Sequence, residues 1–243
     1  MKKFIVEDSM WELFPDTSIG VVVVKDMKPG TQISEQHQSE IASALVRANE
    51  TANQYLTSNV ISENEVVRIW REAFQKFKTK KGARCTLENL LKRVLRDNPV
   101  GPIFPAVDIT NMIGLKYALP LGIENTDAMA GNFRLGITQG GDSFLPIAED
   151  AQEEPSLPGE LCYLDDVGAI CRCWNWRDGQ RTAVDNTTRN AIVVIENIDP
   201  ARADVLEDAI NEAAELIERY FDASIMTKAI VTKENPEVPI DLK

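Results

Sequence analysis

The sequence predicts an α+β fold, because helical patterns lead in the first half of the chain and strand patterns dominate its centre. The 243 residues make one large domain or two small ones, and a chain of this length can bury a sizeable core. Apolar residues account for 44% of the sequence and charged residues for 26%, which is ordinary for a globular protein. We therefore expect a core of mixed or antiparallel sheet with flanking helices, in one or two lobes.

Five helices are expected, four of them in the first half of the chain, where a capping side chain precedes apolar residues at helical spacing. The fifth is long and begins at a proline. The expected helices run from Thr31 or Ser34 to about Tyr55, from about Glu63 (with a Ser62–Glu65 capping box) to Phe77, from Thr86 to about Arg96, from Asp108 to about Leu119, and from Pro200 to about Tyr220.

Strands are expected where β-branched or apolar runs are bounded by turn residues. They cover residues 19–24, two segments within 131–145 joined by the turn Gly140-Gly141-Asp142, and residues 159–165, 169–177, 190–196 and 225–232. In this organisation residues 1–60 form an N-terminal strand and helical segment packed on the core. Residues 61–232 form the core itself, and residues 233–243 form a polar tail.

The net charge of −12 argues against DNA binding and against broad, non-specific binding of any nucleic acid. The charge is uneven, however. A basic strip, residues 76–96, holds eight basic residues and one acidic one, and residues 146–166 hold seven acidic residues and no basic one. The strip is either a solvated face or a contact for RNA phosphates. Its candidate RNA contacts are Lys78, Lys80, Lys81 and Arg84, over which an acidic loop, residues 149–154, could fold in the free protein.

No metal or cofactor is expected. The four cysteines fit no zinc spacing, and the sequence contains no phosphate-binding loop and no nucleophile elbow. The first residues contain no apolar signal segment, and no apolar run is long enough to span a membrane, so we expect a cytoplasmic protein with reduced thiols. The one histidine, His37, falls on the polar side of an expected helix, so catalysis has to proceed without it.

The stretch from Leu161 to Thr188 is the strongest candidate for a binding site. As a strand it would place Arg172, Trp174 and Trp176 on one face, because side chains alternate along a strand. A planar guanidinium over an indole ring makes a good surface for a flat or anionic ligand. The alternative is that the tryptophans belong to the core and the arginines cover it.

Several ordered segments of the chain resemble a known family. They are residues 107–111, 119–122, 133–135 and 140–144, then Gly159-Glu160, Cys171-Arg172, residues 174–177 and Thr187-Thr188. This string is similar to the tRNA-editing domain of the bacterial phenylalanyl-tRNA synthetase β subunit, built from its third and fourth B modules, and more closely to free-standing relatives of that domain. The resemblance spans about residues 70–198.

The resemblance implies an editing-domain fold and an enzyme that acts in trans on a mischarged aminoacyl-tRNA. In the synthetase this domain hydrolyses tyrosine wrongly esterified to the phenylalanine tRNA. Two residues of the family pattern are absent here: Gly122 stands where the synthetase has a histidine, and residues 174–179 lack the glutamate that recognises the tyrosine hydroxyl. The amino acid that this chain would remove, and the mechanism by which it would do so, are therefore not carried over from the synthetase.

Ester hydrolysis needs a positioned water, donors for the oxyanion and a clamp on the terminal ribose. Glu160 is expected to orient the water or bind the amine, and the arginines to bind phosphate or developing negative charge. The tryptophans are expected to stack on the adenine or the amino-acid side chain. The candidate catalytic residues are Glu160, Arg177 and Asn175, and the candidate substrate-binding residues are Asn111, Arg134, Arg172, Trp174, Trp176 and Thr188.

A structural interpretation stands beside each assignment. Asp108 can be a helix cap, Thr188 can simply precede a strand, and Arg134 can pair with the acidic loop or with Glu160. A second function is also open: a non-catalytic protein that keeps the editing-type pocket as a receptor for an amino acid, a nucleoside or an RNA 3′ end. The expected partner is tRNA or aminoacyl-tRNA, and the basic strip distinguishes this from a small-molecule ligand.

Overall fold

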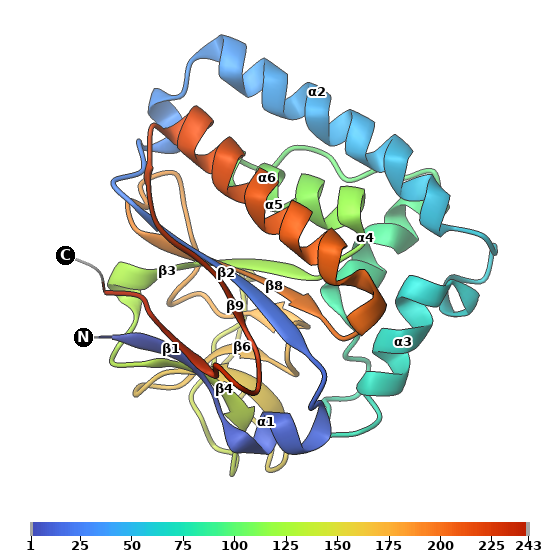
Figure 1. Cartoon of the computed structure of the whole chain (residues 1–243), viewed down its shortest axis with the longest axis vertical. Helices are drawn as coiled ribbons and strands as arrows, with labels where there is room; N and C mark the ends of the chain where they lie inside the picture. The colour runs from blue at the N-terminus through green and yellow to red at the C-terminus, as the bar shows by residue number, and fades with distance from the viewer. Residues whose placement is uncertain (1, 242–243) are drawn as a thin grey trace.

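The computed structural model describes residues 2–241, which form two β-sheets with flanking helices (Figure 1). This architecture confirms the α+β class, with mixed and antiparallel sheet, that the sequence predicts. The four-stranded sheet contains, in spatial order, β3 (Leu121–Asn125), β8 (Ala191–Asn197), β2 (Ser18–Lys25) and β9 (Ser224–Val231). The six-stranded sheet contains β10 (Glu237–Pro239), β1 (Lys3–Val6), β4 (Phe133–Ile137), β5 (Leu161–Leu164), β6 (Ala169–Arg172) and β7 (Arg177–Asp178).

The helices differ widely in length. The α-helices are α1 (Asp8–Leu13), α2 (Glu35–Ala52), α3 (Glu65–Ala73), α4 (Thr86–Leu95), α5 (Pro105–Tyr117) and α6 (Ala203–Phe221). Single 3-10 turns cover Gly30–Gln32, Asn53–Tyr55, Ile61–Glu63, Thr126–Ala128 and Pro200–Arg202. Within residues 2–241, none of the helices has the length and apolar character that a membrane crossing requires.

The four-stranded sheet is the central layer of the molecule. Its strands β2 and β8 are buried along almost their whole length, as expected for strands covered on both faces. Helix α6 packs on β2, β8 and β9, helix α5 packs on β3, and α2 lies outside α5 (Figure 1). At Gly20 a side chain would come within 2.5 Å of Ile210 on α6, so glycine permits the close approach of helix and sheet.

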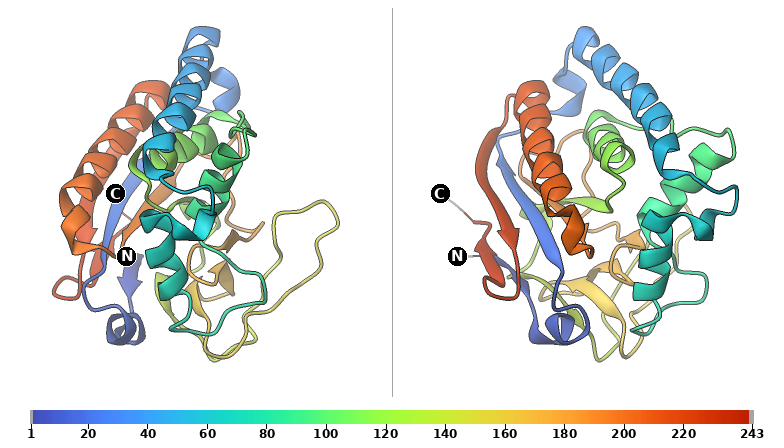
Figure 2. Two further views of the ribbon diagram at one scale, coloured as in Figure 1. Left: turned by 90° about the vertical axis from the view of Figure 1, so that its right-hand side faces the viewer. Right: turned by 45° about the vertical axis from the view of Figure 1, so that its right-hand side comes forward.

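The six-stranded sheet lies on the other side of the central layer. Its strands β1 and β4 are parallel, and its other neighbours are antiparallel. The rings of Phe4, Phe133 and Tyr163 stack in the core, and the Tyr163 hydroxyl donates a hydrogen bond to Glu196 on β8 across the two sheets. The two ends of the chain meet where β1 pairs with β10 (Figure 1). A long loop between β4 and β5 extends away from the sheets (Figure 2).

Two of the predicted helix starts, those of α3 and α5, were wrong, and the structure decides between the two alternatives for the start of α2. The hydroxyl of Ser34 accepts a hydrogen bond from the backbone at the start of α2, so Ser34 rather than Thr31 is the cap. The predicted capping box at Ser62 was wrong, because α3 begins two residues later, after Asn64. The buried amide of Asn64 instead hydrogen-bonds to the backbone of the preceding loop, which fixes the chain before the helix starts.

Helix α5 begins at Pro105, not at Asp108 as predicted. Proline suits the first turn of a helix because its fixed φ is already helical and no partner for an N–H is needed there. Asp108 lies inside the first turn and accepts a hydrogen bond from the backbone N–H of Ile103 at 2.7 Å. The carboxylate therefore fastens the incoming loop to the helix.

The predicted continuous strand over residues 169–177 was wrong. Strand β6 ends at Arg172, and Cys173 and Trp174 adopt left-handed φ values of 48° and 63°. This turn reverses the chain into β7, so Trp174 and Trp176 do not share a strand face. The division into residues 1–60, 61–232 and 233–243 stays a prediction, and the strand pairs β1–β10 and β2–β8 cross its boundaries.

Candidate functional site

The predicted Trp–Arg surface is divided between the hydrophobic core and a cavity. Trp174 has no exposed surface, and its ring centroid lies 4.9 Å from those of both Phe14 and Trp70. A stacking role for Trp174 does not fit this position, because no ligand can reach the ring without unfolding the core. Trp176 is only partly buried, and the charged ends of Arg177 and Lys80 each lie 5.9 Å from its ring.

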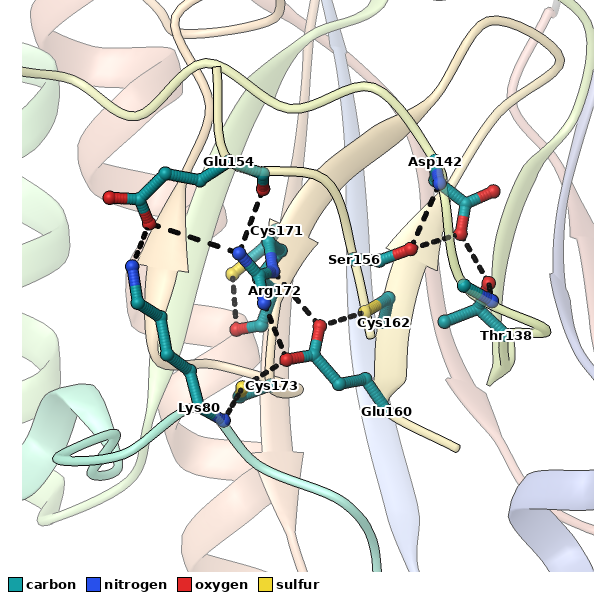
Figure 3. Close-up of polar contacts among 11 residues, drawn as sticks. Lys80, Thr138, Asp142, Glu154, Ser156, Glu160, Cys162, Cys171, Arg172 and Cys173 are labelled. Carbon is teal, nitrogen blue, oxygen red and sulfur yellow. Dashed lines mark hydrogen bonds and ion pairs between the residues drawn. The ribbon is translucent and has the colours of Figure 1, made fainter. Parts of the chain in front are cut away.

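Glu160 and Arg172 form a buried ion pair (Figure 3). The Arg172 guanidinium donates to the two carboxylate oxygens of Glu160 at 2.5 and 2.9 Å, and both side chains are essentially unexposed. The thiols of Cys162 and Cys173 complete the surroundings of the carboxylate, at 3.7 and 3.4 Å. Burial raises the pKa of Cys173 to about 12, so this thiol stays neutral. Glu160 is thus saturated by protein groups, and neither a water-orienting nor an amine-binding role fits its position.

Arg172 also connects the sheet to the loop that contains Glu154, and Glu154 in turn contacts the loop that contains Lys80. Another nitrogen of Arg172 donates to the backbone carbonyl of Glu154 at 2.8 Å, and the Glu154 carboxylate is paired with Lys80 (Figure 3). The acidic loop therefore contacts the basic strip at this point. Lys78, Lys81 and Arg84 are exposed on the strip.

Arg134 and Thr188 lie in structural positions outside the cavity described below. Arg134 pairs with Glu7 at 2.7 Å, so the two partners proposed from the sequence, the acidic loop and Glu160, were wrong. The Thr188 hydroxyl exchanges hydrogen bonds with Asp185 in the turn that precedes β8. Both residues hold backbone segments together, and neither lines the cavity.

A cavity lies between the two sheets. Its inner chamber has a volume of about 30 Å³ and is lined by β3 and β8 on one side and by β5, β6 and β7 on the other. Its polar wall consists of Glu124, Tyr163, Asn175, Asp178 and Glu196. An outer chamber of about 310 Å³ adjoins it along α5 and β3, and the two chambers share the wall residues Thr86, Leu121, Gly122 and Asp178.

The register of β3 and β8 explains why the inner chamber is open. Gly122 lies opposite Val194, and Glu124 and Glu196 flank this pair on the same face of the sheet. A side chain at Gly122 would meet only Val194, at 3.6 Å. The absence of a side chain at Gly122 therefore leaves free space between two buried carboxyl groups.

Several polar atoms around this space have no hydrogen-bond partner. They are Oε2 of Glu124, Oε2 of Glu196 and both atoms of the Asn175 amide, in side chains that are between 1% and 7% exposed. Buried polar groups in folded proteins nearly always have partners. This concentration of unpartnered groups distinguishes the inner chamber from an ordinary packing gap.

Burial changes the acidity of the inner chamber. It raises the pKa of Glu196 to about 8, against a smaller opposing influence of the Tyr163 hydroxyl and the Asn175 amide. Burial also raises the pKa of Glu124 well above its ordinary value, with repulsion from Asp178 adding to it, and burial raises the pKa of Asp178. At neutral pH Glu196 therefore holds a proton in the empty chamber, and it can release this proton when a cation binds beside it.

The structure thus brings together part of the predicted site. Asn175, Trp176 and Arg177 line the inner chamber, and Asn111 lines the outer one. The sequence-based reasoning missed Glu124, Asp178 and Glu196. A signal was present for one of them, since Glu196 lies in a strand that is otherwise β-branched and fully buried. In residues 2–241, no three His, Cys, Asp or Glu side chains are grouped closely enough to hold a metal ion.

The chain is similar to known proteins over most of its length. The B3/4 domain family model matches residues 69–232. The phenylalanine–tRNA ligase β subunit of Fusobacterium nucleatum subsp. nucleatum is 29% identical over 110 residues, which cover 45% of this chain and 13% of that protein. A crystal structure of an N-terminal fragment of the phenylalanyl-tRNA synthetase β subunit from Pyrococcus horikoshii aligns with 97% of this chain and 53% of the fragment, with a TM-score of 0.46 and 10% identity. The family and sequence matches confirm the resemblance drawn from the sequence.

Proposed function

This chain belongs to the B3/4 domain family, and we propose that it is a trans-editing deacylase that hydrolyses the ester bond of an aminoacyl-tRNA. One observation carries the proposal: a two-chambered cavity whose inner end holds unpartnered, buried polar groups. The outer chamber, at about 310 Å³, lies at the lower end of the usual range for small-ligand pockets. A tRNA substrate further implies a cytoplasmic protein.

The residues at the junction of the chambers are those that could act on the ester. Asp178 lines both chambers, and a carboxyl group whose pKa is raised toward neutrality is a better base than an ordinary one. In the proposed step Asp178 takes a proton from water, the water oxygen adds to the ester carbonyl carbon, and the bond to the ribose oxygen breaks as that oxygen regains a proton. Arg177 stabilises the oxyanion, and Asn175 and Asn111 hold the substrate.

The second candidate is a receptor that binds an aminoacyl-tRNA without turnover. It is favoured by Gly122, which stands where the synthetase pattern has a histidine, and by Glu196, whose raised pKa of about 8 keeps it protonated at neutral pH. A protonated carboxyl group cannot accept a proton from water. Turnover would then be slow or absent, whereas binding would be retained.

The test is deacylation of a panel of tRNAs, each charged with one labelled amino acid. We expect hydrolysis of one or a few of them, and a fall of about 100-fold or more for Asp178→Asn and Arg177→Ala. Asp208→Asn and Arg47→Ala, at exposed helix positions, are the matched controls. Saturable binding without hydrolysis selects the receptor, and the absence of both removes both functions.

The basic strip gives a separate test of the RNA partner. Reversing the charges of Lys78, Lys80 and Lys81 should lower tRNA affinity and reduce its dependence on salt concentration, because each lost phosphate contact lowers the slope by about 0.7–0.9. Lys80 is paired with Glu154, so Lys78 and Lys81 are expected to account for most of the effect. Unchanged affinity in the triple variant would mean that RNA binds elsewhere.

A further inference from the structure

We propose that the inner chamber binds a protonated amine, so that the ligand of this site is an amino acid presenting a positively charged nitrogen between the two sheets. This inference rests on the proposed function and deepens it by naming the chemical class that the cavity accepts. It applies equally to the deacylase and to the receptor, because both hold an amino acid in the same place.

Carboxyl groups reach the chamber from three different strands. Glu124 comes from β3, Glu196 from β8 and Asp178 from β7. Among residues 2–241, Arg177 is the one cationic residue of the chamber wall, and its guanidinium lies 5.9 Å from the ring of Trp176. Three carboxyl groups against one guanidinium leave the chamber with an excess of acidic groups.

The remaining titratable groups near the chamber do not correct this excess. Burial raises the pKa of the thiols of Cys85 and Cys171 and of the Tyr163 hydroxyl, so all three are neutral. Burial raises the pKa of Glu124 and Arg181 opposes this, but the Arg181 guanidinium is itself paired with both oxygens of Asp165. A cationic group of a ligand would balance the excess of carboxyl groups in the chamber wall.

Acceptors outnumber donors among the unpartnered atoms of the chamber wall. Oε2 of Glu124, Oε2 of Glu196 and Oδ1 of Asn175 are three acceptors without a partner, in side chains more than nine-tenths buried, and Nδ2 of Asn175 is an unpartnered donor. An ammonium group has three N–H donors and no acceptor. This second observation is independent of the charge excess and indicates a donor-rich ligand.

The size of the chamber favours an amine over larger or simpler cations. A volume of about 30 Å³ holds roughly one or two water-sized groups, which is the size of an ammonium group and far too small for an aromatic ring. Within residues 2–241, no group of three His, Cys, Asp or Glu side chains could hold a metal ion. The rest of the amino acid would occupy the outer chamber, at about 310 Å³.

Amine binding should depend on pH in a defined direction. In the empty chamber burial raises the pKa of Glu124, of Asp178 and of Glu196, that of Glu196 to about 8. An entering ammonium group stabilises the carboxylate forms, so protons are released on binding. Affinity should therefore rise between about pH 6 and pH 8, where a site for a neutral ligand would show no such increase.

The experiment is titration calorimetry of the full chain with four amides of one chain length. N-Acetylnorleucinamide carries no amine, norleucinamide carries the α-amine, Nα-acetyl-lysinamide carries the side-chain amine, and N-acetyl-6-hydroxynorleucinamide replaces the latter by a hydroxyl. We expect at least one amine-bearing ligand to bind about tenfold or more tightly than both amine-free ones. Which ligand it is distinguishes the α-amine from the side-chain amine. Buffers of different ionisation enthalpy should report the released protons.

Glu124→Gln, Asp178→Asn and Glu196→Gln are the matched variants. Each resembles the protonated carboxyl group of the empty chamber, so folding should be retained while the preference for amines falls toward unity. Equal binding of all four ligands, or binding of none, would overturn the inference. Deacylation that ignores the amine would remove the inference and leave the proposed function, and amine binding without deacylation would do the reverse.

Discussion

Replacing Glu160 by glutamine separates a structural role for this carboxylate from a catalytic one. The Glu160 side chain is unexposed and accepts two hydrogen bonds from Arg172, which is 1% exposed. Glutamine keeps the size of the side chain, but its single carbonyl oxygen can accept only part of this interaction and carries no charge. Because arginine cannot release its proton at accessible pH, the variant contains a buried cation with a weaker partner.

The expected loss follows from what Arg172 retains. Removing one member of a buried ion pair costs about 3–5 kcal/mol. Arg172 keeps its hydrogen bond to the Glu154 carbonyl at 2.8 Å and a carboxylate contact with Glu154 at 3.8 Å, so we expect the lower end, about 3 kcal/mol. In a chain of this size each kcal/mol lowers Tm by about 2–4 °C, which gives a fall of about 6–12 °C.

Thermal and urea unfolding measure this loss directly. Lys80→Met is the control, because it breaks the partly exposed Lys80–Glu154 pair and should cost less than about 1 kcal/mol. The double variant Glu160→Leu with Arg172→Met should recover most of the stability, since it removes both buried charges together. A Glu160→Gln protein that has the Tm of the wild type but no longer hydrolyses an aminoacyl-tRNA ester would refute this reasoning and restore a catalytic role for Glu160.

Three further outcomes follow from the same structure. Trp174→Ala should cost about 3–5 kcal/mol in urea unfolding, because the ring is wholly in the core, whereas Trp176→Ala should mainly weaken ligand binding. Burial in the folded protein raises the pKa of Glu196 from 4.5 to about 8, so the stability that its protonated form contributes is complete below about pH 4.5 and is lost as pH rises toward 8. Tm should therefore fall between these two pH values, and the fall should be smaller in Glu196→Gln. Gly122→Ala should leave stability within about 1 kcal/mol, since its methyl group meets only Val194 at 3.6 Å, but should weaken ligand binding in calorimetry by filling the chamber.

The elements that could be predicted are those whose signals are local. The run from Ile19 to Val24 gave β2, and Ser34 with apolar residues at helical spacing gave α2. The reversal after Arg172 could not be predicted, because Cys173 and Trp174 adopt a left-handed conformation that residues of these types rarely adopt. An alternating pattern over such a segment looks like a strand, and the assignment of strand faces then fails.

The candidate site was harder to predict for a different reason. Glu124 and Glu196 are far apart in sequence and come to flank the Gly122–Val194 pair only through the register of β3 and β8, which no local pattern specifies. Asp178 joins them from the other sheet through a contact between layers. Conversely, Glu160 and Arg172 had the residue types of a catalytic pair, but their complementary charges satisfy each other inside the protein.

Glycine at position 122 has one physical consequence in this chain. It leaves a space on the sheet between Glu124 and Glu196, and the wall of that space carries more carboxyl groups than its Arg177 guanidinium can neutralise. A histidine at this position would fill that space and offer the carboxyl groups a cationic partner of its own. In the proposed amine site, the ligand in place of a histidine supplies the cation beside Glu124 and Glu196.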